Sequence, residues 1–132
     1  MKVLFDTGSR CLDPAFLILR LGLSFVFIFA GIFKLNNPSA ASMFDLPVWL
    51  FLLIGSFEVI SGIGVLLGFL TRPSTVFQIV ILLGAIFVVG GGNIANTQVP
   101  VALDAGLLAI PVALLLYGPG RYSLDAKLNR RH

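Results

Sequence analysis

Long apolar blocks separated by short polar segments dominate the chain. They cover about residues 15–35, 48–70, 74–89 and 100–117. At a helical rise of about 1.5 Å per residue, blocks of roughly 20 residues approach the length needed to cross about 30 Å of hydrocarbon. Each block is a continuous apolar run rather than an alternating one, which excludes a closed β-barrel. The pattern therefore predicts an all-α integral membrane protein, a four-transmembrane-helix up-down bundle.

Residues typical of helix ends mark the borders of these blocks. Pro14, with Asp13 before it as a candidate N-cap, is expected in the first turn of the first helix, which ends at residues 36–38. Pro73 fits the first turn of the third helix in the same way, because that position needs no backbone N–H. Pro111 lies inside the fourth block and is expected to kink it.

Outside the blocks, the chain is too short for a separate soluble domain. We expect residues 1–13 to form a cytoplasmic N-terminal tail, residues 14–120 the transmembrane domain and residues 121–132 a basic cytoplasmic tail. A secretory signal is not expected, because the first block is already of spanning length and follows a mixed polar segment.

Lysine and arginine residues are distributed unevenly between the two ends of the predicted bundle. An even number of spans places both termini and the turn at residues 71–73 on one side. Only Lys34 falls on the other side, and Arg20 lies within a span. The positive-inside rule therefore predicts that both termini are cytoplasmic. The basic residues on that side are Lys2, Arg10, Arg72, Arg121, Lys127, Arg130 and Arg131.

The composition limits the chemistry available to the chain. Of 132 residues, 58% are hydrophobic and 11% charged, whereas soluble domains carry about 25% charged residues. Cys11 is the only cysteine and His132 the only histidine, which leaves no thiol pair, no histidine-ligated haem within the bundle and no Cys/His zinc site. We therefore expect no metal. The nine basic residues show no interleaving with aromatic residues, so nucleic-acid binding is not expected either.

Ionisable side chains inside membrane spans are expensive and are candidates for function. From the helical rise, Arg20 and Gln78 form one polar layer near the cytoplasm, and Glu58 and Asp104 form a second layer about 12 Å farther out. Two carboxylates at one level cannot both stay charged without a cation nearby, so either one holds a proton or Arg20 neutralises one of them. These four residues are the candidates for a buried polar or quinone site.

The same features also have a structural interpretation. Buried polar side chains fix the register of membrane helices by hydrogen bonding without any ligand. Lys34, at the end of a span, is interpreted as an anchor that extends toward the headgroups. Gly22 and Ser24, together with Gly64 and Gly68, mark candidate helix contacts.

Several phenylalanines of the first block have two interpretations as well. They either line an apolar cleft suited to a quinone or a lipid, or they face acyl chains. The residues concerned are Phe25, Phe27, Phe29 and Phe33.

Three motifs resemble those of the DoxX family. The family's opening helix is similar to RLG and AGIFKL at residues 20–22 and 30–35, and its second helix and following turn to EVISG and LLGFLTRP at 58–62 and 66–73. Its C-terminal signature resembles GPGRYSLD at 118–125. The matching positions are Arg20, Lys34, Glu58, Arg72, Gly118, Gly120 and Asp125.

This resemblance implies a four-helix protein of the bacterial inner (plasma) membrane, related to the DoxD subunit of a thiosulfate:quinone oxidoreductase. The leading hypothesis is an accessory or quinone-associated subunit of a membrane redox system. In it, Glu58 carries a proton and Arg20 supplies the counter-charge. No covalently bound cofactor is expected, so a soluble or membrane redox partner supplies the electrons and autonomous catalysis is not expected.

Two alternatives of other classes stay open. A small-molecule or proton-coupled transporter could use the same carboxylates, and it would need a homo-oligomer because one four-helix bundle rarely encloses a substrate route. A structural membrane scaffold would instead hold a soluble partner on its basic tail.

Overall fold

The computed structural model describes residues 2–91, 101–118, 120 and 122–129. The described part of the chain is helical apart from its connections and contains no β-strand. Three of its helices are long and apolar enough to cross a membrane, namely Asp13–Asn36, Val48–Leu67 and Thr71–Val89. Val101–Tyr117 is a shorter apolar helix. These helices agree with the all-α membrane class and, within a few residues, with the four apolar blocks.

The first helix is longer than predicted. Helix α1 spans Lys2–Asn36 and contains Pro14 in its interior instead of in its first turn. A proline inside a helix removes one backbone hydrogen bond and strains the preceding turn. This destabilises the helix locally, but a long helix can still continue through it. The segment that we expected to be a tail is therefore helical from Lys2.

A short 3-10 helix, η1 (Pro38–Phe44), connects α1 to α2 (Val48–Leu67). Helix α2 ends at Gly68, where the backbone adopts the left-handed conformation with φ of 68°. The N–H of Phe69 then donates to the carbonyl of Gly64 at 2.9 Å, the pattern that satisfies the last carbonyls of a helix. This glycine stops the helix before residue 70, where the predicted span ended.

The third predicted span consists of two helical types. Helix α3 (Thr71–Gly84) carries Pro73 in its first turn, as predicted, and continues into the π-helix η2 (Ala85–Val89). Helix α4 (Val101–Tyr117) contains Pro111, and the short α5 (Leu124–Asn129) follows.

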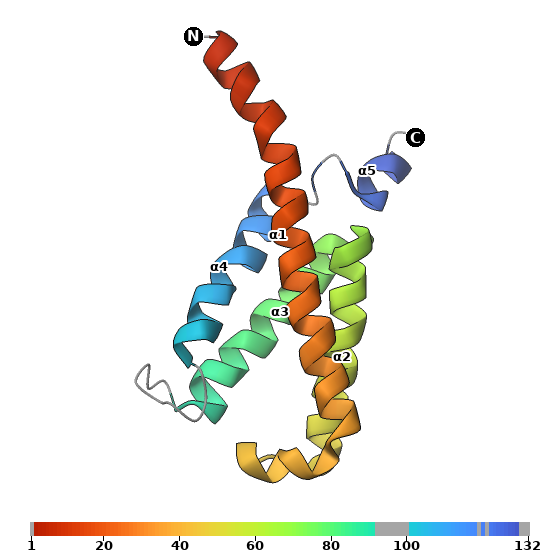
Figure 1. Ribbon diagram of the computed structural model, residues 1–132, viewed down its shortest axis with the longest axis vertical. Coiled ribbons are helices and arrows are strands. Elements are labelled where there is room, and N and C mark those ends of the chain that lie inside the picture. Colours follow the sequence, from red (N-terminus) through yellow and green to blue (C-terminus); the bar gives the residue numbers. More distant parts are fainter. Residues whose placement is uncertain (1, 92–100, 119, 121, 130–132) are drawn as a thin grey trace.

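The helices pack around a core drawn from α1 to α4 (Figure 1). The start of α1, the α2–α3 connection and α5 lie toward one end of the molecule, and η1 lies across the other end. A second small apolar cluster forms where η1 packs on α2. The main core cluster consists of Leu23, Phe27, Val65, Leu82 and Leu114.

Glycines allow the backbones of α1 and α2 to approach closely. A Cβ atom added at Gly31 would lie 2.6 Å from the carbonyl oxygen of Gly55, and one at Gly62 would lie 2.7 Å from Ile28. Gly22, which we expected at a helix contact, has no atom within 4 Å of such a Cβ. Ser24, also expected at a contact, does face α2, because its carbonyl oxygen lies 3.3 Å from the added Cβ of Gly62. The contact extends along α1 to Gly31 and brings Lys34 alongside Gly55 of α2.

Candidate functional site

An ion pair joins α1 and α2 next to this glycine contact. The Nζ atom of Lys34 donates to Oε1 and Oε2 of Glu58 at 2.9 and 2.8 Å. The side chain of Glu58 is 6% exposed and that of Lys34 19%. Lys34, which we interpreted as a membrane anchor, is instead the cation that neutralises Glu58.

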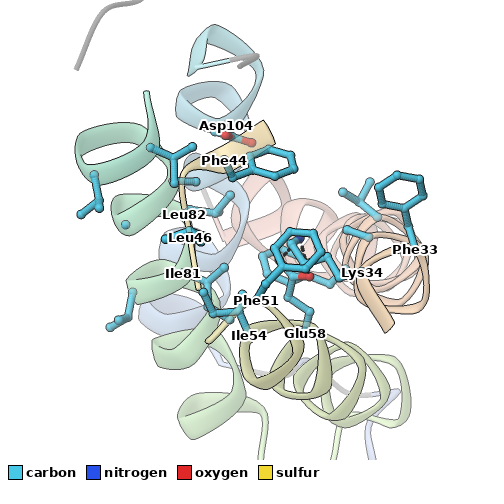
Figure 2. Close-up of a pocket in the computed structure, with 18 of the residues that line it drawn as sticks. Phe33, Lys34, Phe44, Leu46, Phe51, Ile54, Glu58, Ile81, Leu82 and Asp104 are labelled. Carbon is cyan, nitrogen blue, oxygen red and sulfur yellow. Dashed lines mark hydrogen bonds and ion pairs between the residues drawn. The ribbon is translucent and has the colours of Figure 1, made fainter. Parts of the chain in front are cut away.

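The ion pair lies in the wall of a cavity of about 660 Å³ (Figure 2). Residues of α1, η1, α2, α3, η2 and α4 line this cavity. Among the residues that the structure describes, the charged ones in its lining are Lys34, Glu58 and Asp104. Phe51 lies next to the pair, with Nζ of Lys34 5.9 Å from its ring centre. Pockets that hold small ligands typically measure about 300–1,000 Å³ and are mostly apolar with a few polar groups.

Most of the phenylalanines singled out in the sequence belong to this cavity. Phe27, Phe29 and Phe33 are among its lining residues, whereas Phe25 is outside it and 71% exposed. Helix α1 therefore supplies part of an apolar cleft, and Phe25 stacks on Phe29 at the edge of it, with the ring centres 6.1 Å apart.

Asp104 reaches the cavity from the first turn of α4 and is partly buried. Figure 2 shows it beside Phe44, away from the Lys34–Glu58 pair. In the described part of the chain no side chain lies within ion-pair distance of its carboxylate, although the charge of Lys34 acts on it electrostatically. Asp104 and Glu58 therefore share one cavity, as their predicted common level suggested.

Arg20 lies at the expected end of the bundle but has partners other than those expected. It is 1% exposed, and its guanidinium donates to the backbone carbonyls of Val65, Leu66 and Tyr122, each at 3.0 Å. The first two belong to the last turn of α2, whose carbonyls have no partner within the helix. The expected neutralisation of Glu58 by Arg20 is wrong, because the guanidinium binds the end of α2 instead.

Asp125 completes this end of the molecule. Its carboxylate accepts hydrogen bonds from the backbone N–H groups of Leu70 and Thr71 at 3.0 and 3.1 Å, where α3 begins. The N–H of Asp125 in turn donates to the carbonyl of Gly68 at 3.0 Å. We call Arg20, Gly68 and Asp125 the capping cluster, because they satisfy the end of α2 and the start of α3.

The sequence did not reveal the role of this C-terminal segment. Its only signal was an aspartate behind two glycines, Gly118 and Gly120, both of which adopt positive φ, 97° and 78°. Ser123 caps α5, since its Oγ accepts from the N–H of Ala126 at 3.1 Å.

Arg72 is an exposed residue in the first turn of α3.

Gln78 is fully buried on α3 but is not paired with Arg20. Neither its side-chain oxygen nor its nitrogen has a hydrogen-bond partner among the residues that the structure describes. The predicted polar layer of Arg20 and Gln78 is therefore not formed, and Gln78 is outside the set of residues that line the cavity.

The described residues offer no set of side chains that could bind a metal ion. They contain no group of three or more histidine, cysteine, aspartate or glutamate residues that could hold a metal ion. What the cavity offers is an ammonium donor, two carboxylate acceptors and a large apolar wall.

Comparison with known proteins places this arrangement in a family. The model of the DoxX family matches residues 15–91, which include α2, α3 and both residues of the ion pair. The chain belongs to the DoxX family. It is also 29% identical over 136 residues to an uncharacterised membrane protein of Mycobacterium tuberculosis, covering 89% of this chain and 83% of the relative. No solved structure matches the chain.

The motif residues of this DoxX protein belong to two separate groups of interacting side chains. Lys34 and Glu58 form the ion pair in the cavity, whereas Arg20 and Asp125 belong to the capping cluster. The cavity thus has the polar groups to orient a ligand, and the capping cluster holds the helices that form its walls.

Proposed function

We propose that this DoxX protein binds a quinone in the cavity next to Lys34 and Glu58 and acts as an accessory subunit of a membrane redox system. One observation carries the proposal: an ion pair and a further carboxylate face a cavity of about 660 Å³ that is otherwise apolar. A quinone combines an apolar ring and tail with two carbonyl oxygens that need donors. Its chemistry therefore matches the wall of the cavity.

Lys34 is the donor in this proposal. An ammonium group has three N–H donors, and the oxygens of Glu58 accept two of them. The third is available to a quinone carbonyl. Glu58 keeps the proton-carrying role that we expected from the sequence, but Lys34 replaces Arg20 as its counter-charge.

Electron transfer is left to a partner protein in this scheme. The chain supplies binding and proton exchange, and the partner supplies the redox centre. Quinones dissolve in the bilayer, so a ligand reaches the cavity through the lipid.

Quinone binding by the full-length protein in lipid nanodiscs tests the proposal. The probe is decylubiquinone, measured by equilibrium partitioning against empty nanodiscs. Ala30 lies one turn before Lys34 and lines the cavity, so Ala30→Phe fills the site without removing a charge. Ala109→Phe makes the same change at an exposed position of α4 outside the cavity lining.

We expect Ala30→Phe and Glu58→Gln to lower the affinity at least tenfold and Ala109→Phe to leave it unchanged. Binding no stronger than that of empty nanodiscs, or equal binding by both phenylalanine variants, contradicts the proposal. Flux of a labelled solute into proteoliposomes together with no quinone binding would favour a transporter.

We also propose that the chain crosses the bacterial inner membrane four times with both termini in the cytoplasm. The basic residues support this, because Arg72 and Lys127 lie at the end of the molecule where α5 is found, whereas Asp45 follows η1 at the other end. Single cysteines at Asp45 and at Lys127, in a Cys11→Ser background, test the orientation. In intact spheroplasts an impermeant maleimide should label the first and spare the second.

A further inference from the structure

The charges that face the cavity do not balance. Lys34 brings one positive charge, and the carboxylates of Glu58 and Asp104 bring two negative ones. Glu58 takes two hydrogen bonds from Lys34 and is fully neutralised by it. The uncompensated carboxylate is that of Asp104.

Asp104 is also the polar group of the cavity with the least support from the protein. In the described residues it takes part in no side-chain hydrogen bond and no ion pair, and its contact with Lys34 is a longer-range attraction. Placement in the first turn of α4 favours a negative charge there, because the amide end of a helix is the positive end of its dipole. In its ionised form Asp104 is therefore a hydrogen-bond acceptor in the wall of the cavity.

A hydrogen-bond acceptor at this point interacts differently with the oxidised and the reduced form of a quinone. Ionised carboxylates only accept hydrogen bonds. The carbonyl oxygens of the oxidised form also only accept, so one of them near Asp104 would meet an unfavourable contact. A hydroquinone carries hydroxyl groups that can donate to Asp104, while the oxygen of its other hydroxyl accepts from Lys34.

We infer that the cavity binds the hydroquinone form of its ligand in preference to the quinone, with Asp104 as the residue that makes the distinction. This inference rests on the proposed function, since it names the redox state of the same ligand in the same cavity. It concerns binding alone and involves no electron transfer. A DoxX protein with this preference would hold the reduced product of a quinone-reducing partner or present that reduced form to a partner that oxidises it.

Affinities of the full-length protein in nanodiscs for decylubiquinol and decylubiquinone, measured without oxygen, test the inference. A charge-assisted hydrogen bond in place of an acceptor–acceptor contact is expected to favour the hydroquinone about tenfold or more in the native protein. Asp104→Asn is expected to abolish most of this preference, because an amide both donates and accepts. The loss should come from weaker hydroquinone binding, with quinone binding unchanged or stronger.

Asp45→Asn is the matched control. It removes the charge of an exposed aspartate outside the cavity lining, at a left-handed backbone position that asparagine tolerates, and should leave both affinities unchanged. Equal affinity of the native protein for the two forms, or a preference that survives Asp104→Asn, overturns the inference while leaving quinone binding intact. Failure to bind either form refutes the proposed function as well. The native comparison does not depend on how well any variant folds.

Discussion

Lys34 holds both carboxylate oxygens of Glu58, at 2.9 and 2.8 Å, across the contact between α1 and α2. The two residues lie on different helices, and the glycine contact at Gly31 and Gly55 brings those helices close enough for the pair to form. In a membrane interior an isolated charge is far more costly than a neutralised one. The position and charge of Glu58 therefore depend on Lys34.

Removal of Lys34 should destabilise the protein strongly. Lys34→Met leaves the Glu58 carboxylate buried without its cation, and breaking a buried pair in this way typically costs about 3–5 kcal/mol. The 19% exposure of the Lys34 side chain places the expected loss near the lower end of this range. Reversible unfolding in mixed micelles with increasing denaturing detergent measures it.

The double variant Lys34→Met/Glu58→Met is expected to recover most of that stability, because no unpaired charge remains. Lys127→Met serves as the control, since Lys127 is exposed on α5 and its loss should change the free energy of unfolding by about 0.5 kcal/mol or less. A single variant as stable as the native chain would show that Glu58 does not need the pair.

Long apolar runs were sufficient to predict the helical class and the approximate positions of the three helices long enough to cross a membrane and of the shorter apolar helix α4. The length of α1 was not predictable from Pro14, because one proline ends some helices and is accommodated inside others. The π-helix η2 was not predictable either, because it changes the hydrogen-bond spacing without changing the apolar pattern.

The candidate site was predicted only in part. Counting residues along the predicted helices assigned Glu58 and Asp104 to one level of the bundle, and in the structure both residues line the same cavity. The same arithmetic assigned Lys34 to the membrane surface, because it ignores the reach of a long side chain back along its helix. Arg20 was misassigned because its partners are backbone carbonyls, which leave no trace in the side-chain pattern.

Arg20 should be required for the stability of the α2–α3 end and not for the charge of the cavity. Arg20→Met removes the guanidinium donor from the buried carbonyl of Val65 and from the partly buried carbonyl of Leu66, and among the described residues only Val65 keeps another donor, the N–H of Gly68. Hydrogen bonds to charged groups contribute about 1.5–3 kcal/mol each, so a loss of at least about 3 kcal/mol is expected. Arg72→Met, at an exposed site on the same end of the molecule, should have little effect on detergent unfolding.

Arg20→Lys separates charge from geometry in the same assay. A lysine keeps the positive charge but lacks the planar fork that reaches several carbonyls at once. We expect it to restore less than half of the stability lost in Arg20→Met. Full rescue by lysine would mean that charge alone matters at this position.

Asp125 should control the start of α3. Its carboxylate accepts from the N–H groups of both Leu70 and Thr71, and loss of such a cap typically costs about 0.5–2 kcal/mol. Asp125→Ala is expected to speed hydrogen exchange of these two amides while amides in the middle of α3 stay protected. Asp125→Asn should have a smaller effect, because its amide oxygen can still accept from one of the two N–H groups. Unchanged exchange at both amides in the alanine variant would contradict the capping role.

Two glycines of α1 offer a direct test of the helix contact that positions the ion pair. A methyl group at Gly31 would lie 2.6 Å from the carbonyl oxygen of Gly55, so Gly31→Ala must push α1 and α2 apart. Overpacking of this kind costs about 1–3 kcal/mol. Gly22→Ala adds the same methyl group where no atom lies within 4 Å, and it should stabilise the helix by about 0.5–1 kcal/mol.

Separation of the helices should also weaken the ion pair itself. A double-mutant cycle on Lys34 and Glu58, measured by detergent unfolding, is therefore expected to give a smaller coupling energy in the Gly31→Ala background than in the Gly22→Ala background. Because both backgrounds carry one added methyl group on α1, a difference between them reports the distance between α1 and α2 rather than helix propensity. Equal coupling in the two backgrounds would show that Lys34 follows Glu58 when the helices move, and that the glycine contact does not determine the geometry of the pair.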